Sequence, residues 1–179
     1  TLEIHKCIRY SDNALRLFFE KASKESWFEN TLFVLTADHT NQTEHPEYWT
    51  DYGRYAVPII FYTPDGDLKG YRDAIAQQID IMPTVLSYLG YDKPYVSFGC
   101  DLLNTPAEDT YAVNYNNGIY HILQFDGEKT VAVYAFKTDK LLKENLVGQV
   151  PQQGAMELEL KAIIQQYMER MNGDRMTVE

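Results

Sequence analysis

The sequence predicts an α/β protein that ends in a small antiparallel sheet and a terminal helix, and three observations predict this class. Two short apolar runs, residues 31–37 and 57–62, alternate with two helical patterns in the first half of the chain. From about residue 111, runs of β-branched and aromatic residues have the lengths of meander strands. Apolar residues then recur at helical spacing from Met156 to Tyr167.

The elements of the first half follow from periodicity. Apolar residues recur at helical spacing over about residues 2–24, with lysine and arginine side chains available for the opposite face, so we expect an amphipathic helix. The run "TLFVLTA", residues 31–37, is typical of a strand that is buried on both faces. "VPIIFY", residues 57–62, predicts a second strand, and the "TPDGD" that follows predicts a turn.

A second helix and the meander follow. In "QIDIMPTVLSYLG" we expect Asp80 to cap a helix that has Pro83 in its first turn and stops at Gly90. The Asp-Gly pair at residues 126–127 predicts a hairpin between the last two strands, and the polar stretch "VGQVPQQG" predicts a loop before the terminal helix.

We expect one domain, in which residues 1–110 form part of an α/β core and residues 111–179 form the meander and terminal helix. The chain begins at Thr1 and enters a helical pattern at once, so we expect it to be a piece of a larger protein.

Composition argues against two classes of function, nucleic-acid binding and a cysteine-rich zinc site. The 45% hydrophobic content is ordinary for a globular protein, and the formal net charge of -10 argues against nucleic acid as a partner. Cys7 and Cys100 are the only cysteines and form no C-x-x-C pair, which excludes a cysteine-rich zinc site. They could form a single disulfide, but we expect two free, largely buried thiols.

Asp38 and His39 come directly after the first predicted strand, at the end of a strand where ligands bind in open α/β sheets. A carboxylate and a neutral imidazole can both bind Zn²⁺, Mn²⁺ or a similar ion. The pair is either part of a metal site or a turn-capping aspartate beside a hydrogen-bonded histidine. His45 is either a substrate contact or proton donor to a leaving oxygen, or an exposed loop histidine.

Other polar residues point less clearly to chemistry. Arg54 and Arg72 could hold an anionic substrate, although a solvated arginine is the default in such mixed polar sequence. His121 lies in a strand pattern that favours a core or cross-strand role. The sequence has no Gly-rich phosphate loop, G-x-S-x-G elbow or Cys-His dyad, so it offers no identifiable nucleophile.

Several segments taken together resemble a known family. "IRYSDNALRLFFEKASKESWFENTLFVLTADHT", "VPIIFYTP", "QQIDIMPTVLSYLGY" and "FGCDLL" occur in this order. They resemble the C-terminal part of the sulfatase and phosphoglycerol transferase group of the alkaline phosphatase superfamily, in particular its lipoteichoic acid synthase-like branch. The resemblance covers about Arg9 to Leu103 and continues loosely through "VNYNNGIY".

The resemblance implies a partial α/β sandwich with a small antiparallel sheet and a C-terminal helix. It implies that Asp38 and His39 are ligands of a divalent ion (Mn, Ca, Mg or Zn), and that His45 matches a histidine often found shortly after such a pair. In the family the nucleophile is a threonine, or a formylglycine made from cysteine. That nucleophile and a further acidic ligand normally precede the segment seen here.

The chain departs from the family in what it lacks. Neither Cys7 nor Cys100 has the C-x-P-x-R context of formylglycine, and no nucleophile is present. We therefore expect weak metal binding and no activity from this piece alone, and a partner in the missing N-terminal part of the same domain.

The resemblance implies that the parent is a sulfuric-ester hydrolase or phosphoglycerol transferase on the extracytoplasmic side of a bacterial membrane. Its substrate would be a lipid- or glycan-linked phosphate or sulfate ester. The alternative is a non-catalytic module that retains the fold and binds a glycan or a partner.

Overall fold

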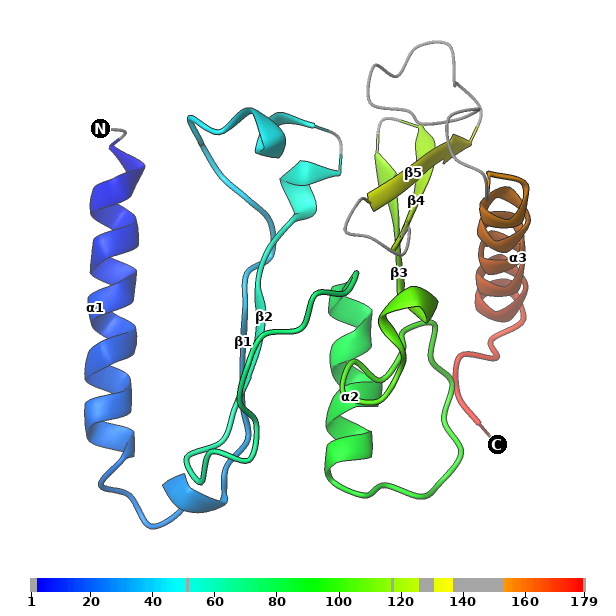
Figure 1. Ribbon diagram of the computed structural model, residues 1–179. Helices are drawn as coiled ribbons and strands as arrows, with labels where there is room; N and C mark the ends of the chain where they lie inside the picture. Colours follow the sequence, from blue (N-terminus) through cyan, green and yellow to red (C-terminus); the bar gives the residue numbers. More distant parts are fainter. Residues whose placement is uncertain (1–2, 51, 117, 126–130, 137–152, 179) are drawn as a thin grey trace. The chain divides into compact units, whose positions relative to one another are not determined.

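Figure 1 shows the computed structural model of the protein, which describes residues 3–50, 52–116, 118–125, 131–136 and 153–178. The chain divides into two compact units, Thr1–Tyr71 and Arg72–Glu179. The expected change from core to meander at residue 111 falls inside the second unit and stays a prediction.

The first unit contains a long helix followed by two short strands (Figure 1), as the periodicity predicted. Each strand is shorter than its apolar run, and two 3₁₀ helices occupy the connection between them. In chain order the elements are α1 (Ile4–Ala22), a 3₁₀ helix (Phe28–Asn30), β1 (Phe33–Thr36), the 3₁₀ helices Pro46–Trp49 and Gly53–Tyr55, and β2 (Ile59–Tyr62).

Aromatic rings hold the helix and the strands of this unit together. β1 and β2 pair antiparallel, with Phe33 opposite Tyr62. The ring centroid of Phe19, on α1, lies 5.1 Å from that of Phe33 and 5.5 Å from that of Tyr62. The expectation of a strand buried on both faces is wrong: no residue of β1 or β2 is buried. In the described residues this sheet has only two strands, so it cannot bury both faces.

The second unit combines a short helix, a three-stranded sheet and a long helix. The predicted meander is confirmed, with strand order β3-β4-β5 and antiparallel pairing throughout. The hairpin predicted at residues 126–127 and most of the loop predicted before the last helix lie outside the described residues. The elements are α2 (Ile81–Tyr88), β3 (Tyr111–Asn116), β4 (Ile119–Phe125), β5 (Val131–Phe136) and α3 (Gln153–Asn172), with 3₁₀ helices at Gln78–Asp80 and Ala107–Asp109.

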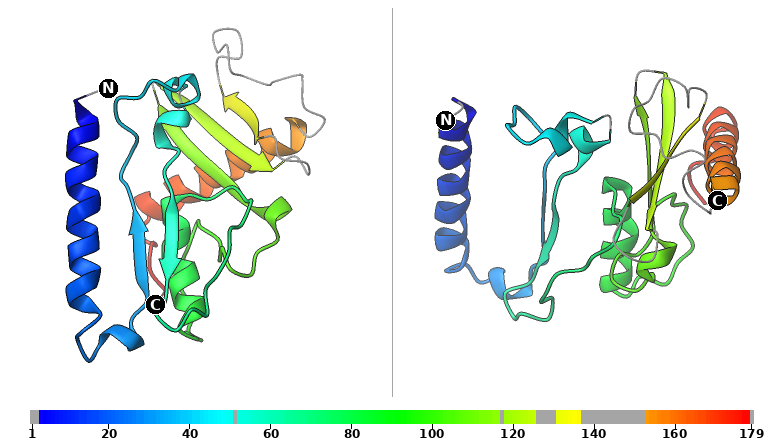
Figure 2. Two further views of the ribbon diagram at one scale, coloured as in Figure 1. Left: turned by 60° about the vertical axis from the view of Figure 1, so that its left-hand side comes forward. Right: turned by 45° about the horizontal axis from the view of Figure 1, so that its top comes forward.

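The core of this unit lies between α3 and the sheet. Ile122 of β4 and two α3 residues one turn apart, Met156 and Leu160, are all fully buried. The helix therefore lies along one face of the sheet, as two views agree (Figure 1, Figure 2). His121 precedes Ile122 and so points to the opposite face. It is 2% exposed, which confirms the predicted core histidine.

The ends of α2 confirm one expectation and correct another. Gly90 has φ of 69°, and the Tyr91 N–H donates to the Leu86 carbonyl at 2.9 Å, which is the helix stop that the glycine predicted. Asp80 does not cap α2 through its side chain. Its backbone is already helical, so its carboxylate turns instead toward the N–H groups of Gln77 and Cys100.

The cysteines are both free, but they are not alike. Cys7 is exposed on α1, which corrects the expectation of a buried thiol, while Cys100 is half-buried. Burial, and then the charge of Asp80, raises the pKa of the Cys100 thiol. None of the helices in the described ranges combines the length and the apolar character that a membrane crossing requires.

Candidate functional site

Asp38 and His39 lie just beyond the end of β1, where the sequence placed them. The Asp38 Oδ1 atom accepts the backbone N–H of His39 at 2.9 Å, so the carboxylate is turned back along the chain toward its neighbour. The two side chains are 87% and 58% exposed, respectively. Both are therefore accessible to an ion or a substrate from outside.

The hydrogen bonding of His39 favours one ring nitrogen as a ligand. Its Nδ1 atom lies 2.7 Å from the Thr40 carbonyl oxygen. A carbonyl only accepts, so Nδ1 donates to it; in the neutral imidazole Nε2 then holds the lone pair, which is the arrangement common in metal-bound histidines. His39 Nε2 lies 3.4 Å from Asp38 Oδ2. Two ligand atoms each about 2.1 Å from one tetrahedral ion are about 3.4 Å apart, so the pair fits neighbouring positions on one ion.

Thr40 ties this pair to the segment before β2. Its N–H and its Oγ1 hydroxyl both donate to the Arg54 carbonyl oxygen, each at 2.9 Å. Arg54 belongs to the 3₁₀ helix Gly53–Tyr55. The loop after β1 is therefore held by a fixed point 14 residues later in the chain.

Gly53 allows the two 3₁₀ helices of the connection to approach closely. A Cβ atom at this position would lie 2.0 Å from the Glu47 carbonyl oxygen and 2.6 Å from Thr50 Oγ1. The Gly53 N–H donates to that hydroxyl at 2.9 Å. Only glycine fits this contact, which brings Arg54 beneath the His39–Thr43 loop.

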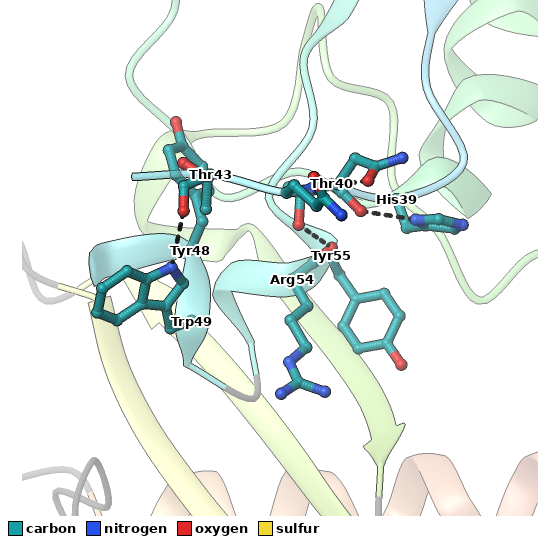
Figure 3. Close-up of a pocket in the computed structure, with 9 residues that line it drawn as sticks. His39, Thr40, Thr43, Tyr48, Trp49, Arg54 and Tyr55 are labelled. Carbon is teal, nitrogen blue, oxygen red and sulfur yellow. Dashed lines mark hydrogen bonds between the residues drawn. The ribbon is translucent and has the colours of Figure 1, made fainter. Parts of the chain in front are cut away.

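The loop and the two 3₁₀ helices enclose a pocket of about 620 Å³ (Figure 3). One wall is polar and comes from the loop, and the other is aromatic and comes from the 3₁₀ helices. The Trp49 indole N–H donates to the Thr43 carbonyl at 3.1 Å and so joins the two walls. The lining residues are His39, Thr40, Asn41, Gln42, Thr43, Tyr48, Trp49, Arg54 and Tyr55.

The structure distinguishes the roles of Arg54 and Arg72, both of which the sequence had suggested as possible contacts for an anionic substrate. Arg54 lines the pocket. Arg72 instead donates from its guanidinium to the carbonyl oxygens of Leu102 and Thr105, so it holds a loop of the second unit. A structural role therefore explains Arg72, whereas Arg54 lines the pocket.

His45 is near the pocket without lining it. Its Nδ1 atom lies 3.4 Å from Glu47 Oε1, and its side chain is 72% exposed. Its ring centroid is 6.5 Å from that of Tyr48, which does line the pocket. Its assignment as a substrate contact or proton donor stays a prediction.

In the described ranges, no three His, Cys, Asp or Glu side chains lie close enough together to hold a metal ion. This part of the chain therefore offers no third ligand beside Asp38 and His39. The assignment of Asp38 and His39 as two ligands of a metal ion stays a prediction. They would hold an ion weakly unless further groups completed the site.

A second pocket, of about 560 Å³, lies within the other unit between α3 and the sheet. Its lining is mostly methionine, aromatic and aliphatic; the polar lining residues are Gln77, Ser97, Asn114 and four tyrosines, and its described lining residues include no His, Asp, Glu, Lys or Arg. The pocket beside His39 is the better candidate site for ester chemistry, because it contains an imidazole and a guanidinium.

The aromatic wall of the first pocket was missed by sequence reasoning. A signal was present, since "HPEYWTDYGRY" places four tyrosine or tryptophan residues within a short polar stretch between two strands. The polar residues of this stretch argue against a buried strand or an amphipathic helix. Its aromatic rings therefore do not belong to a core packed by regular elements, and they can line a surface pocket.

Comparisons with known proteins cover this site. A family model described as Sulfatase matches residues 3–91, which include Asp38, His39 and the whole pocket. Lipoteichoic acid synthase 1 of Bacillus subtilis (strain 168) is 29% identical over 150 residues, which are 76% of this chain and 23% of that relative. Lipoteichoic acid synthase of Staphylococcus aureus (strain USA300) is 29% identical over 111 residues, 54% of this chain and 17% of that relative. The chain thus spans less than a quarter of the length of these relatives.

A solved structure shares the fold. The crystal structure of a protein in the alkaline phosphatase superfamily from Vibrio parahaemolyticus matches with a TM-score of 0.59 and 23% identity. The match covers 96% of this chain and 42% of that chain. This confirms the predicted α/β class, and the chain spans less than half the length of that structure.

Proposed function

This chain belongs to the sulfatase and lipoteichoic acid synthase-like group of the alkaline phosphatase superfamily, and we propose that it supplies part of a metal-dependent active site for phosphate or sulfate esters. Asp38 and His39 are the proposed ligands. The observation that carries the proposal is the 3.4 Å separation of His39 Nε2 from Asp38 Oδ2, with Nδ1 engaged by the Thr40 carbonyl.

Each residue of the site has a proposed role. Asp38 contributes negative charge toward a divalent ion such as Mn²⁺, Ca²⁺, Mg²⁺ or Zn²⁺, and His39 contributes a directed nitrogen. When bound, such an ion neutralises charge on phosphoryl or sulfuryl oxygens. Thr40 keeps the imidazole in its orientation. His45, on the loop between the pair and the pocket's aromatic wall, donates a proton to the leaving oxygen.

The remaining groups are proposed to come from elsewhere in the full-length protein. The chain spans less than a quarter of its relatives, and the described part holds two candidate ligands and no identifiable nucleophile. Exposed apolar side chains on α1, such as Ile8 (56% exposed) and Phe18 (47%), fit a helix that packs against further protein. The proposed partner is the N-terminal part of the same catalytic domain.

The substrate and location are proposed at the level of the family. The substrate is a phosphate or sulfate ester carried by a lipid or a glycan, and the reaction is phosphoglycerol transfer or ester hydrolysis. The catalytic domain of the parent protein lies on the extracytoplasmic side of a bacterial membrane. The names of the lipoteichoic acid synthases among its relatives support the transferase version.

The test measures metal binding and ester cleavage by the full-length protein. Mn²⁺ and Zn²⁺ affinity is measured by calorimetry, and cleavage of 4-nitrophenyl phosphodiester and sulfate substrates with and without metal. Asp38→Asn and His39→Ala are expected to weaken metal binding at least about tenfold and to abolish cleavage. Asp12→Asn, a surface change on α1, is the control and should alter neither. Metal affinity that survives both site variants would overturn the assignment and leave a binding module.

A further inference from the structure

The pocket beside His39 has no negative charge of its own. The chain carries 26 acidic residues and a formal net charge of -10, yet the described residues that line this pocket include no Asp or Glu. Their one permanent charge is the Arg54 guanidinium. The Asp38 carboxylate lies 3.4 Å from His39 Nε2 but does not line the pocket. A ligand beside the Arg54 guanidinium therefore meets a positive charge, which suits that part of the pocket to an anion.

Arg54 combines a fixed backbone with a side chain that is open to a ligand. Its carbonyl oxygen accepts two hydrogen bonds from Thr40, which fixes the backbone from which the side chain extends. Within the described part of the chain, no carboxylate lies within ion-pair distance of its guanidinium. Figure 3 shows this guanidinium directed away from the His39–Thr43 loop. Arginine binds phosphate and sulfate oxygens through two parallel N–H bonds, which suits it to an anionic group on a substrate.

Trp49 offers a flat apolar surface that is held in place. Its N–H bond to the Thr43 carbonyl fixes the ring, and yet the residue is 59% exposed. Tyr48 and Tyr55, on the same wall, are 36% and 45% exposed. Fixed, exposed rings of this kind bind well to a ligand that has an apolar face and a polar rim. The pyranose ring of a sugar has both.

The opposite wall supplies hydrogen-bonding groups for hydroxyls. Asn41, Gln42 and Thr43 together carry amide and hydroxyl donors and acceptors. The volume of about 620 Å³ lies within the range of small-molecule sites, roughly 300–1,000 Å³, and leaves room for more than one sugar ring. A glycerol unit has no ring and so offers an indole face much less apolar surface than a sugar does.

We propose that this pocket selects substrates whose non-reacting part is a sugar ring carrying an anionic group, with Trp49 stacking on the ring and Arg54 holding the anion. This proposal takes the reaction from the proposed function, but the binding that it assigns to Trp49 and Arg54 does not require metal. Trp49 and Arg54 are then specificity-determining residues, and the substrate class is a charged glycan.

The test is calorimetric binding to the full-length protein in the presence of EDTA, so that metal plays no part. The probes are glucose 6-phosphate, glucose 6-sulfate, glucose, glycerol 1-phosphate and inorganic phosphate. Either charged sugar is expected to bind at least about tenfold more tightly than glucose, glycerol 1-phosphate or inorganic phosphate. Equal affinity for glycerol 1-phosphate and the charged sugars would overturn the sugar assignment, and equal affinity for glucose would overturn the anion contact.

Matched variants assign the contacts. Arg54→Gln should weaken charged-sugar binding at least about tenfold, whereas Arg9→Gln, on α1, should not. Trp49→Leu should weaken all sugars, whereas Trp27→Leu, which removes an indole outside the pocket, should not. Variants that behave like their controls would overturn the proposal. Because these titrations contain no metal, charged-sugar binding can fail while Asp38 and His39 still bind metal, or succeed while they do not.

Discussion

The Asp80 carboxylate accepts the backbone N–H of Cys100 at 2.8 Å and so joins the start of α2 to a segment 20 residues later. Its other oxygen accepts the Gln77 N–H at 2.8 Å. One turn along the helix, Thr84 Oγ1 accepts the Leu102 N–H at 2.9 Å. Asp80 and Thr84 are both fully buried, so a small polar cluster rather than an apolar contact attaches residues 100–102 to α2.

Asp80→Ala should therefore destabilise the protein strongly. The change leaves two part-buried backbone N–H groups without their acceptor, and each costs up to about 1–3 kcal/mol, so we expect a loss of about 2–6 kcal/mol. Urea unfolding of the full-length protein followed by circular dichroism measures it. Asp92→Ala removes an exposed carboxylate and should change stability by less than about 0.5 kcal/mol. If the two variants unfold at the same urea concentration, the cluster does not stabilise the fold.

Tyr111 gives a prediction in alkaline solution. Its hydroxyl donates to the Phe98 carbonyl at 2.6 Å, and burial, followed by the charge of Glu159, raises its pKa to about 12. Because this folded-state pKa lies above the ordinary tyrosine value of 10.0, the stabilisation from the Tyr111 hydroxyl is complete below pH 10 and is lost as pH rises toward 12. The stability difference between wild type and Tyr111→Phe should be about 1 kcal/mol at pH 7 and shrink above pH 10.

Ultraviolet titration at 295 nm checks the same group. The wild-type curve minus the Tyr111→Phe curve should show one tyrosine that titrates near pH 12. Tyr71→Phe is the control, since Tyr71 is 89% exposed. A Tyr111 difference curve centred near pH 10, or a stability gap that widens above pH 10, would contradict the prediction.

The elements of this fold were predictable because each depends on local pattern. α1 and α3 follow from helical spacing, and Gly90 ends α2 because its positive φ suits glycine. Asp80 occupies the N-cap position of α2, but the expectation that its side chain caps this helix is wrong, because the carboxylate accepts the N–H groups of Gln77 and Cys100. Cys100 lies too far along the chain for a local pattern to indicate this contact. The prediction that β1 is buried on both faces was also wrong. Burial of a strand depends on the neighbouring strands and helices that cover it, and an apolar run does not specify these neighbours.

The sequence indicated the proposed ligands but not the pocket. Asp38 and His39 were proposed because they follow a predicted strand within an ordered set of segments that resembles a known family, and their role as ligands stays a prediction. The pocket depends on Thr40 bonding to the Arg54 carbonyl and on Gly53 meeting Glu47, and neither contact has a sequence signature. The same contacts separate Arg54 from Arg72, which look equivalent in the sequence.

Gly53→Ala should damage the pocket without unfolding the protein. A Cβ atom would lie 2.0 Å from the Glu47 carbonyl oxygen and 2.6 Å from Thr50 Oγ1. A backbone atom and a short side chain cannot move aside easily, so the two 3₁₀ helices must be pushed apart. We expect a stability loss of about 1–3 kcal/mol. We also expect at least about tenfold weaker substrate binding, because Arg54 directly follows Gly53 and is displaced with it.

Gly154→Ala is the matched control for this change. A Cβ atom at Gly154 meets nothing within 4 Å, and the residue lies in α3, so alanine should be neutral or stabilise by up to about 1 kcal/mol. Thermal unfolding and a substrate-dependence curve for each variant provide the comparison. A Gly53→Ala protein with unchanged substrate binding would show that the close approach does not position Arg54.

His45→Ala separates a proton donor from an exposed loop histidine. A general acid matters when the leaving oxygen is a poor leaving group and matters little when it leaves readily as 4-nitrophenolate. Turnover of an alkyl phosphate or sulfate ester by the full-length protein should therefore fall about 10²-fold or more, while cleavage of the 4-nitrophenyl ester changes by less than about threefold. Metal affinity should not change, since the His45 side chain pairs with Glu47 and not with Asp38 or His39. Glu47→Gln, which removes that partner and keeps the imidazole, should retain most of the alkyl-ester activity. An equal loss on both esters would contradict proton donation, and no loss on either would return His45 to an exposed loop residue.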